Sequence, residues 1–152
     1  MQPNCTKEKT MSEPISWRIR AIGREESVRA FADILKNTKK NKENEGNGNP
    51  ERLPEIRGMY YHSSPVIKQP VLIGSVWAVD ASGSSWTSPD VMLTAADDSY
   101  IISLPEAAKR FHVDIEMLAS DWATYDAYDY HILIDSNGCV LVNDAKPALH
   151  EH

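Results

Sequence analysis

Cysteine is scarce in this chain of 152 residues, where only Cys5 and Cys139 occur. Two cysteines do not make the disulfide framework of a small secreted scaffold or the ligand set of a cysteine-based zinc site. Long apolar runs are missing too: the longest, residues 71–79, contains Gly74 and Ser75, whereas a membrane-spanning helix takes about 20 residues. The N-terminus is polar and lacks the apolar core of a signal peptide. We therefore expect a cytoplasmic protein without a membrane span.

Catalytic signatures are also missing. The sequence has no G-x-x-x-x-G-K-[ST] phosphate loop, no G-x-G-x-x-G turn after a strand, and no serine in a nucleophile elbow. The glycines of residues 46–48 lie in a polar segment and do not form a phosphate cradle. We therefore predict no catalytic, cofactor-binding or metal-binding residues, and we favour a protein that is not an enzyme.

Charge is distributed unevenly along the chain, whose net charge is −6. Residues 1–60 carry 12 Lys and Arg against 9 Asp and Glu, whereas residues 61–152 carry 4 against 13. An acidic half repels the phosphates of nucleic acids and attracts a basic protein surface. An alternative interpretation stays open, in which these charges only solvate the surface.

The composition, with 41% hydrophobic and 25% charged residues, is typical of one globular domain. Alternation of apolar and polar residues predicts a first strand over residues 15–22. An apolar stripe at helical spacing predicts a helix from about Arg24 to Lys39. The predicted organisation is a disordered tail at 1–13, a single domain at 14–146 with a mobile loop at 39–52, and a second tail at 147–152.

The second half contains strands, turns and one more helix. Ser103 and Glu106 have the spacing of a capping box, which predicts a helix start at this point. Asn137 and Gly138 form the dipeptide that most strongly indicates a hairpin turn. The remaining predictions are strands at 56–62, 72–80, 91–95, 100–103, 113–119, 130–135 and 139–143, and a turn-rich loop at 81–90.

This order of elements predicts an α+β fold, the ferredoxin-like plait, with an antiparallel sheet, two helices on one face and an added C-terminal hairpin. In that plait the first strand lies beside the strand that follows the second helix. Trp17 would then face the helices, while Arg18 and Arg20 would share the opposite face with Asp114 and Glu116. Pairs of opposite charge on neighbouring strands contribute about 0.2–1 kcal/mol each.

Three segments resemble the YubB-type ferredoxin-like domains of plasmids and phages: VLIGSVWAVDASGSSW, SLPEAAKRFHVDIEM and YHILIDSNGCVLVND. The likeness extends from about Val71 to Asp144. The chain departs from this family at residues 121–129, where the family often has a glycine. The resemblance implies the plait and a setting on a mobile genetic element, and it implies no established activity.

The sharpest local feature is the segment 121–130, which places three aspartates and four aromatic residues within ten positions. Aromatic side chains supply rigid contact area, and carboxylates attract a basic partner. We therefore predict an accessory protein that binds a basic protein partner. The predicted partner-binding residues are Trp86, Asp121, Trp122, Tyr125, Asp126, Tyr128 and Asp129. In the alternative interpretation, Trp122 and Tyr130 cap the core and the aspartates only solvate the loop.

Three further hypotheses are less favoured. Asp126, Asp129 and His131 have a D-x-x-D-x-H spacing that would place oxygen and imidazole ligands for a metal, and a hydrolase would form around them or around Glu116 with His131. A nucleic-acid-binding face would combine the positive side chains with aromatic ones, but acidic residues on the same face would cancel its charge. The residues of that face are Arg18, Arg20, Arg57 and Tyr60 or Tyr61. An open sheet edge also permits a homodimer.

Overall fold

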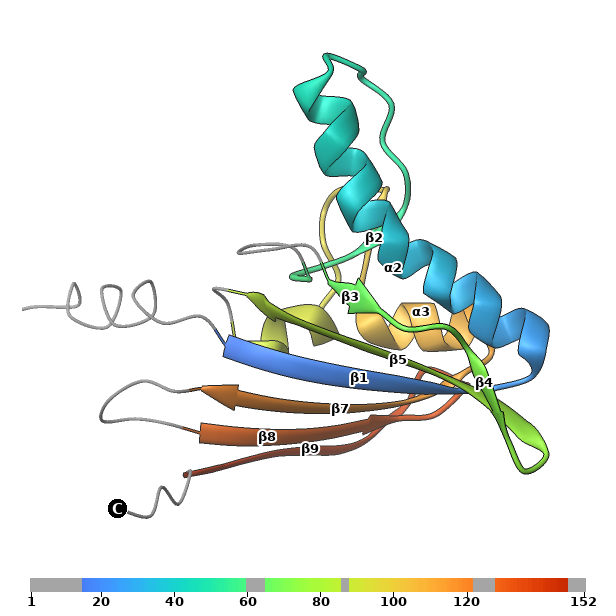
Figure 1. The fold of residues 1–152 in the computed structure, drawn as a ribbon. Helices are drawn as coiled ribbons and strands as arrows, with labels where there is room; N and C mark the ends of the chain where they lie inside the picture. The colour runs from blue at the N-terminus through green and yellow to red at the C-terminus, as the bar shows by residue number, and fades with distance from the viewer. Residues whose placement is uncertain (1–14, 60–64, 86–87, 122–127, 148–152) are drawn as a thin grey trace, which may run out of the picture.

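The computed structural model describes residues 15–59, 65–85, 88–121 and 128–147 (Figure 1). These residues form a mixed α+β structure with two helices and a mostly antiparallel sheet. The elements in chain order are β1 (Ile15–Gly23), α2 (Glu25–Gly46), β2 (Glu55–Ile56), β3 (Val66–Ile67), β4 (Val71–Ile73), β5 (Val76–Ser85), the 3-10 helix η1 (Pro89–Leu93), β6 (Ile101–Ile102), α3 (Leu104–Phe111), β7 (Asp114–Asp121), β8 (Tyr128–Ile134) and β9 (Val140–Pro147). Neither helix has the length and apolar character that a membrane crossing requires.

The main sheet has the strand order β3-β5-β1-β7-β8-β9, and β4 also pairs with β5. Every pairing in it is antiparallel. β1 lies between β5 and β7, so that Arg20 is the register partner of Asp80 on one side and of Glu116 on the other. The predicted pairing of the first strand with the strand after the second helix is therefore confirmed. A separate parallel pair joins β2 to β6.

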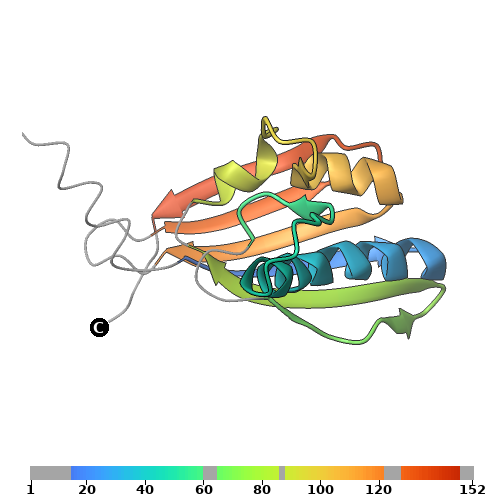
Figure 2. The same cartoon turned by 90° about the horizontal axis from the view of Figure 1, so that it is seen from above.

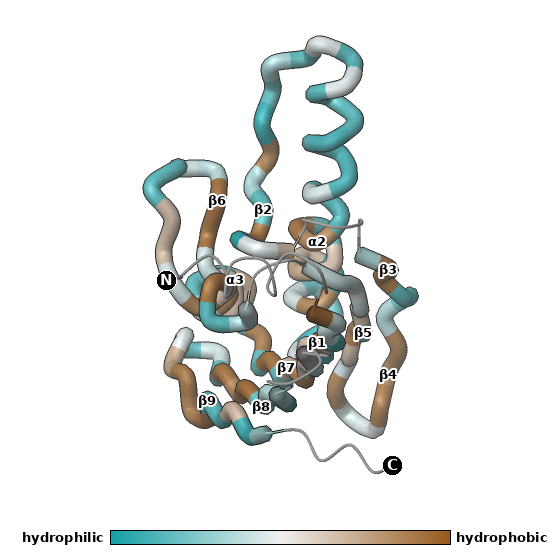
Figure 3. The backbone as a smooth tube through the Cα atoms, turned by 90° about the vertical axis from the view of Figure 1, so that its left-hand side faces the viewer, coloured by the Kyte–Doolittle hydropathy of each residue, from teal (hydrophilic) through white to brown (hydrophobic). Residues whose placement is uncertain are grey.

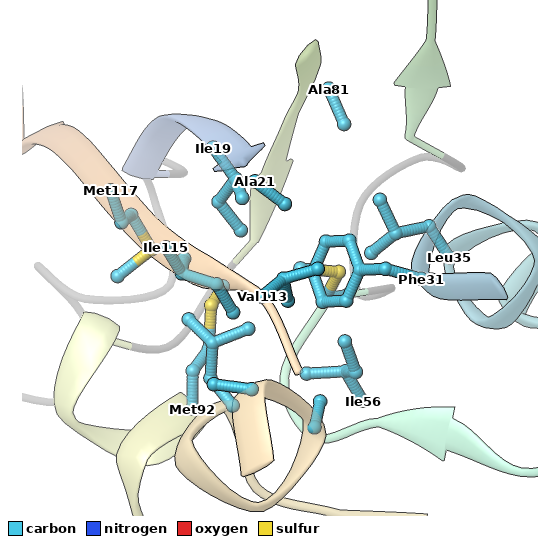
Figure 4. Packing of buried hydrophobic residues seen from close by; sticks show 14 of the residues in the cluster. Ile19, Ala21, Phe31, Leu35, Ile56, Ala81, Met92, Val113, Ile115 and Met117 are labelled. Atoms are coloured by element: carbon cyan, nitrogen blue, oxygen red, sulfur yellow. The ribbon is translucent and has the colours of Figure 1, made fainter. Parts of the chain in front are cut away.

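Both helices lie on one face of the main sheet, as the two perpendicular views show (Figures 1 and 2). The core fills the space between them and the sheet (Figure 4). Trp17, predicted to face the helices, is only 1% exposed, and Phe31 of α2 and Met117 of β7 are fully buried with it. The apolar stripe predicted from the alternation of β1 and β7 is confirmed.

The end of α2 differs from the prediction, which placed it near Lys39 and predicted a mobile loop from there on. The helix continues to Gly46. Asn41 is 4% exposed and ties the helix to the returning chain: its amide donates to the Leu53 carbonyl, and its oxygen accepts from the Leu53 N–H, both at 2.8 Å. The last turns are hydrophilic and project beyond the sheet (Figures 1 and 3).

The segment predicted as one strand at 72–80 is a hairpin. Gly74 has φ +62°, a backbone conformation that glycine adopts without strain, and the chain reverses there between β4 and β5. The side chains of β4, at the outer edge of this hairpin, are exposed. β5 then continues to Ser85, where a loop was predicted, because it pairs with β1 along the whole length of β1.

Two other predicted strands are wrong or too long. Of the segment 91–95, residues 91–93 belong to η1, a short 3-10 helix with Pro89 at its start, where proline is favoured. In the segment 56–62, β2 ends at Ile56, and Gly58 follows with φ +82°. Residues 60–62 lie outside the part of the chain that the structure describes.

The start of α3 and the last hairpin were predicted correctly. Ser103 Oγ accepts a hydrogen bond from the Glu106 N–H at 3.2 Å. The Glu106 carboxylate accepts from Arg110 at 2.6 Å instead of from the Ser103 N–H, so only the serine half of the capping box is formed. Between β8 and β9, Gly138 has φ +83°, and Asp135 Oδ1 accepts from the backbone N–H groups two and four residues further on.

Candidate functional site

The face of the main sheet opposite the helices, the helix-free face, is the strongest candidate for a functional surface. Among the described residues no helix covers it (Figures 1 and 2). Strand alternation places on it the side chains that do not enter the core. They include Arg18, Arg20, Asp80, Ser82, Asp114, Glu116, Leu118, Asp129, His131, Leu133, Val142 and Asp144.

A bidentate ion pair lies at the centre of this face. Arg20 Nε is 2.7 Å from Asp80 Oδ1, and its Nη2 is 2.9 Å from Oδ2. The hydrogen bonds from Arg20 lower the pKa of the Asp80 carboxyl, and the same bonds raise the pKa of the guanidinium. Glu116 was predicted to meet this arginine. The two are register partners, but the hydrogen bonds of Arg20 go to Asp80 on the other neighbouring strand.

Beside this ion pair the helix-free face is hollowed to a volume of about 270 Å³. Strands β1, β5 and β7 and the chain around β3 supply the lining. The lining includes both members of the central ion pair, three further charged side chains and two exposed apolar ones: Arg20, Asp80, Arg18, Lys68, Glu116, Val66 and Leu118.

Glu116 and His131 form a second polar pair on the same face. Glu116 Oε2 is 3.0 Å from His131 Nε2, across the ladder between β7 and β8. The sequence suggested these two residues as an alternative pair, and their contact is confirmed. The register partner of His131 on β9 is Asp144. In the described ranges no serine hydroxyl is hydrogen-bonded to His131, because Ser120 donates to Asp129 instead.

The described members of the acidic aromatic segment lie at one end of the main sheet, with Asp129 on the helix-free face and Tyr128 on the opposite face. β7 ends at Asp121, and β8 begins at Tyr128, which is 37% exposed. The Asp129 carboxylate is exposed and accepts a hydrogen bond from Ser120 at 3.0 Å. Tyr130 packs partly against the core, as the alternative interpretation predicted for it. Of the predicted partner-binding residues, Trp86, Trp122, Tyr125 and Asp126 lie outside the described residues.

Only two of the three residues of the less favoured metal cluster, Asp129 and His131, belong to the described part of the chain. Asp126 lies outside the described ranges. Asp129 bonds to Ser120 and His131 to Glu116, so the two described members have separate partners. In the part of the chain that the structure covers, no group of three His, Cys, Asp or Glu side chains is arranged to hold a metal ion.

The less favoured hypothesis of a basic face with three arginines is contradicted by the position of Arg57. Arg57 follows β2, which pairs with β6 and not with the main sheet. Its guanidinium donates to Thr94 Oγ1 at 3.1 Å and to the Ala95 carbonyl at 2.6 Å. Arg18 and Arg20 lie on the main sheet, so Arg57 does not add its charge to theirs.

A polar cluster beside α2 was not predicted. Burial raises the pKa of the Glu55 carboxyl, although a hydrogen bond from Asn41 at 3.0 Å opposes that rise. Thr38, one turn earlier on α2, is buried. Together with Asn41 and Glu55 it lines a cavity of about 350 Å³. The spacing of Thr38 and Asn41, three residues apart on one helix face, was the available signal. It was missed because the helix was expected to end before it.

Comparison with known proteins returned no similar chain: no protein-family model, no curated protein and no solved structure matches this sequence or its fold.

Proposed function

We propose that this chain is a non-enzymatic accessory protein that binds another protein through its helix-free face and the acidic aromatic end of that face. The observation that carries the proposal is Leu118. It lies in the middle of β7, between two paired strands, and its side chain is 39% exposed on a face without a covering layer. An apolar residue at the centre of an uncovered sheet, ringed by polar side chains, is typical of a protein interface.

The polar surroundings of Leu118 favour a protein over a nucleic acid as the partner. A nucleic-acid site needs a net positive groove. Here the charge of Arg20 is neutralised by Asp80 at 2.7 Å. The other described cations of the face are outnumbered by its other carboxylates, which leaves the face as a whole without a positive excess: Arg18, Lys68 and Lys146 stand against Asp114, Glu116, Asp129 and Asp144. Such a mixed surface supplies specificity through complementary charge.

The acidic aromatic end adds a second contact region. Tyr128 and Asp129 are exposed where β8 begins, and Asp121 ends the neighbouring strand. Strand alternation points Asp129 to the helix-free face and Tyr128 to the opposite face, so the carboxylate attracts a basic partner surface and the exposed tyrosine adds contact area at the same end of the sheet. Trp122, Tyr125 and Asp126 belong to this proposal because they lie between Asp121 and Tyr128 in the sequence. Trp86 belongs to it because it directly follows Ser85, which shares the register partner Ile15 with Asp121.

The strand order supports the plait that the family resemblance implies. β1 lies between β5 and β7 with β3 and β4 beyond β5, which is the strand order expected of a ferredoxin-like plait, and β8 and β9 extend it. We assign the chain to this plait and to a YubB-type accessory role in the cytoplasm of a cell that carries a mobile element. The free edge of β9 also supports pairing between two copies.

A cross-linking experiment tests the proposal. The full chain, carrying a photo-reactive group, captures partners from a lysate, and Leu118→Ser is compared with Leu72→Ser. Leu72 is an exposed leucine in β4, outside the helix-free face. We expect the partner set to be lost with Leu118→Ser and with Tyr128→Ala, and kept with Leu72→Ser. Equal capture by all variants would contradict the proposal, and a shift of labelled DNA or RNA at low salt would favour the nucleic-acid alternative.

A further inference from the structure

The hollow of the helix-free face contains two cations that have no directly bonded counter-ion among the described residues. Among the described residues, the side chains of Arg18 and Lys68 have no hydrogen bond or ion pair, although both line the hollow. They come from different elements, β1 and the chain after β3, and both act on Asp80 by charge alone. A third cation, Arg20, is held by Asp80 through two hydrogen bonds. The two remaining cations are therefore available to a ligand.

The charges around the hollow define the charge of that ligand. Three cations, Arg18, Arg20 and Lys68, face two carboxylates, Asp80 and Glu116, which leaves one positive charge in excess. A singly charged anion balances this excess. A phosphate, with about −1.5 to −2 charges at neutral pH, would exceed it and would be repelled by the two carboxylates.

The walls and the volume of the hollow define the size and the apolar part of that ligand. Val66 is 65% exposed, and Leu118 lies across the lining from β7, so apolar surface stands beside the cations. The volume of about 270 Å³ lies below the roughly 300–1,000 Å³ of pockets for drug-sized ligands. A small group with one charge and a short apolar body fits both conditions.

We propose that this hollow is a binding site for a carboxylate attached to an aliphatic group. The carboxylate lies between Arg18 and Lys68, and the aliphatic part packs on Val66 and Leu118. A free aliphatic acid and the C-terminus of a peptide present the same chemistry. The site shares Leu118 with the proposed partner interface, but a small acid can occupy it without a protein partner, so the two proposals can be tested apart.

Titration of the full chain by NMR tests the site. The probes are hexanoate, an acetylated tripeptide ending in leucine with a free carboxylate, the same peptide as its amide, and inorganic phosphate. We expect saturable shifts of the Arg18 Nε–H signal with hexanoate or the free peptide. Whichever binds more tightly identifies the source. The amide and phosphate are expected to bind at least about tenfold more weakly, since charged hydrogen bonds are worth a factor of that order.

Matched variants locate the binding. Arg18→Gln and Lys68→Gln each remove one cation of the hollow, and we expect each to weaken hexanoate binding about tenfold. Lys146→Gln removes an exposed cation on β9, outside the hollow, and should leave the affinity within about twofold. Equal weakening by all three variants, phosphate binding as tight as hexanoate, or no saturable shift with any probe would overturn the proposal.

Different outcomes contradict the carboxylate site and the partner interface. If hexanoate binding is lost in Arg18→Gln and Lys68→Gln while partner capture persists in both, the carboxylate site stands apart from the interface. If no acid binds and partner capture still depends on Leu118, only the carboxylate site is overturned. Unfolding midpoints of every variant, measured by circular dichroism, exclude loss of folding as the cause of lost binding.

Discussion

At the scale of single residues, Gly83 of β5 leaves the space that the ring of Trp17 occupies. A Cβ atom added at Gly83 would lie 2.7 Å from Cζ2 of the buried Trp17 ring. That distance is shorter than non-bonded carbon atoms adopt, so the ring or the strand would have to move. The register places Gly83 directly opposite Trp17. The glycine is therefore required by the bulk of the tryptophan.

We predict that Gly83→Ala destabilises the protein by about 1–3 kcal/mol, because the added methyl overpacks the core. Thermal unfolding followed by circular dichroism measures the effect. Gly46→Ala is the matched control: a Cβ there meets nothing within 4 Å at the end of α2, so no loss of stability is expected. A Gly83→Ala midpoint equal to that of the wild type would contradict this packing.

For the candidate site, the sequence predicted the faces of the β1 side chains but not the ion-pair partner of Arg20. Alternation placed Arg18 and Arg20 on one face and Trp17 on the other, and both placements are correct. The partner of Arg20 was not predictable, because a central strand offers two neighbours and pattern alone does not choose between Asp80 and Glu116. Arg20 bonds Asp80 because the two side chains lie in the position for two parallel hydrogen bonds, and that position is not visible in the sequence.

At the scale of elements, α2 shows how a tertiary contact extends a helix. Its last turns contain Lys, Asn and Glu, a composition that suits both helix and loop. The hydrogen bonds between Asn41 and Leu53 hold these turns against the returning chain, and Arg52 adds an ion pair with Glu45 at 3.2 Å. Because these contacts join residues distant in sequence, helical periodicity could not predict them.

We predict that Asn41→Ala destabilises the protein by about 1–3 kcal/mol, because the N–H and the carbonyl of Leu53 both lose their partner. Hydrogen exchange should rise over residues 41–46 and remain unchanged in β1. Lys40→Ala, at an exposed position on the same helix, is the control with no expected change in either region. Unchanged protection of residues 41–46 in Asn41→Ala would show that the contact does not hold the helix end.

Elements whose signals lie in neighbouring residues of the sequence were predicted correctly. The caps and turns at Ser103 and Gly138 depend on neighbouring residues and were correct. The turn at Gly74 was missed because branched and aromatic residues on both sides read as one continuous strand. The 3-10 turn of η1 was missed because its five residues are too few to show a period.

At the scale of the whole molecule, two carboxyl groups give opposite contributions to the pH dependence of stability. The pKa of Asp80 is lowered in the folded state, chiefly by its hydrogen bonds to Arg20. Its contribution is present above the ordinary value near 3.8 and is lost as the pH falls through the lowered pKa. The pKa of Glu55 is raised, chiefly by burial, so this group favours the folded state when protonated and loses that advantage as the pH rises above 4.5.

We predict that Glu55→Gln gains stability relative to the wild type between pH 4 and pH 7, because glutamine still accepts from Asn41 without a buried charge. Asp80→Asn should instead lose stability at pH 7, by at most about 1 kcal/mol for so accessible a pair. This loss should shrink as the pH falls below 3.8 and vanish only below the lowered pKa of the folded state. Urea unfolding at both pH values measures these differences. The same pH trend in both variants would contradict the two assignments.

The position of β1 has a consequence for how the molecule acquires its structure. This strand is synthesised before the others of the sheet, yet its two neighbours are β5 and β7, and β7 begins only at Asp114. Half of the ladder bonds of β1 therefore wait until about three-quarters of the chain exists. Contacts between such distant segments carry a large loop-closure cost and slow folding. A nascent chain that stops short of β7 keeps one edge of its central strand bare, and chaperones that recognise extended segments would meet it there.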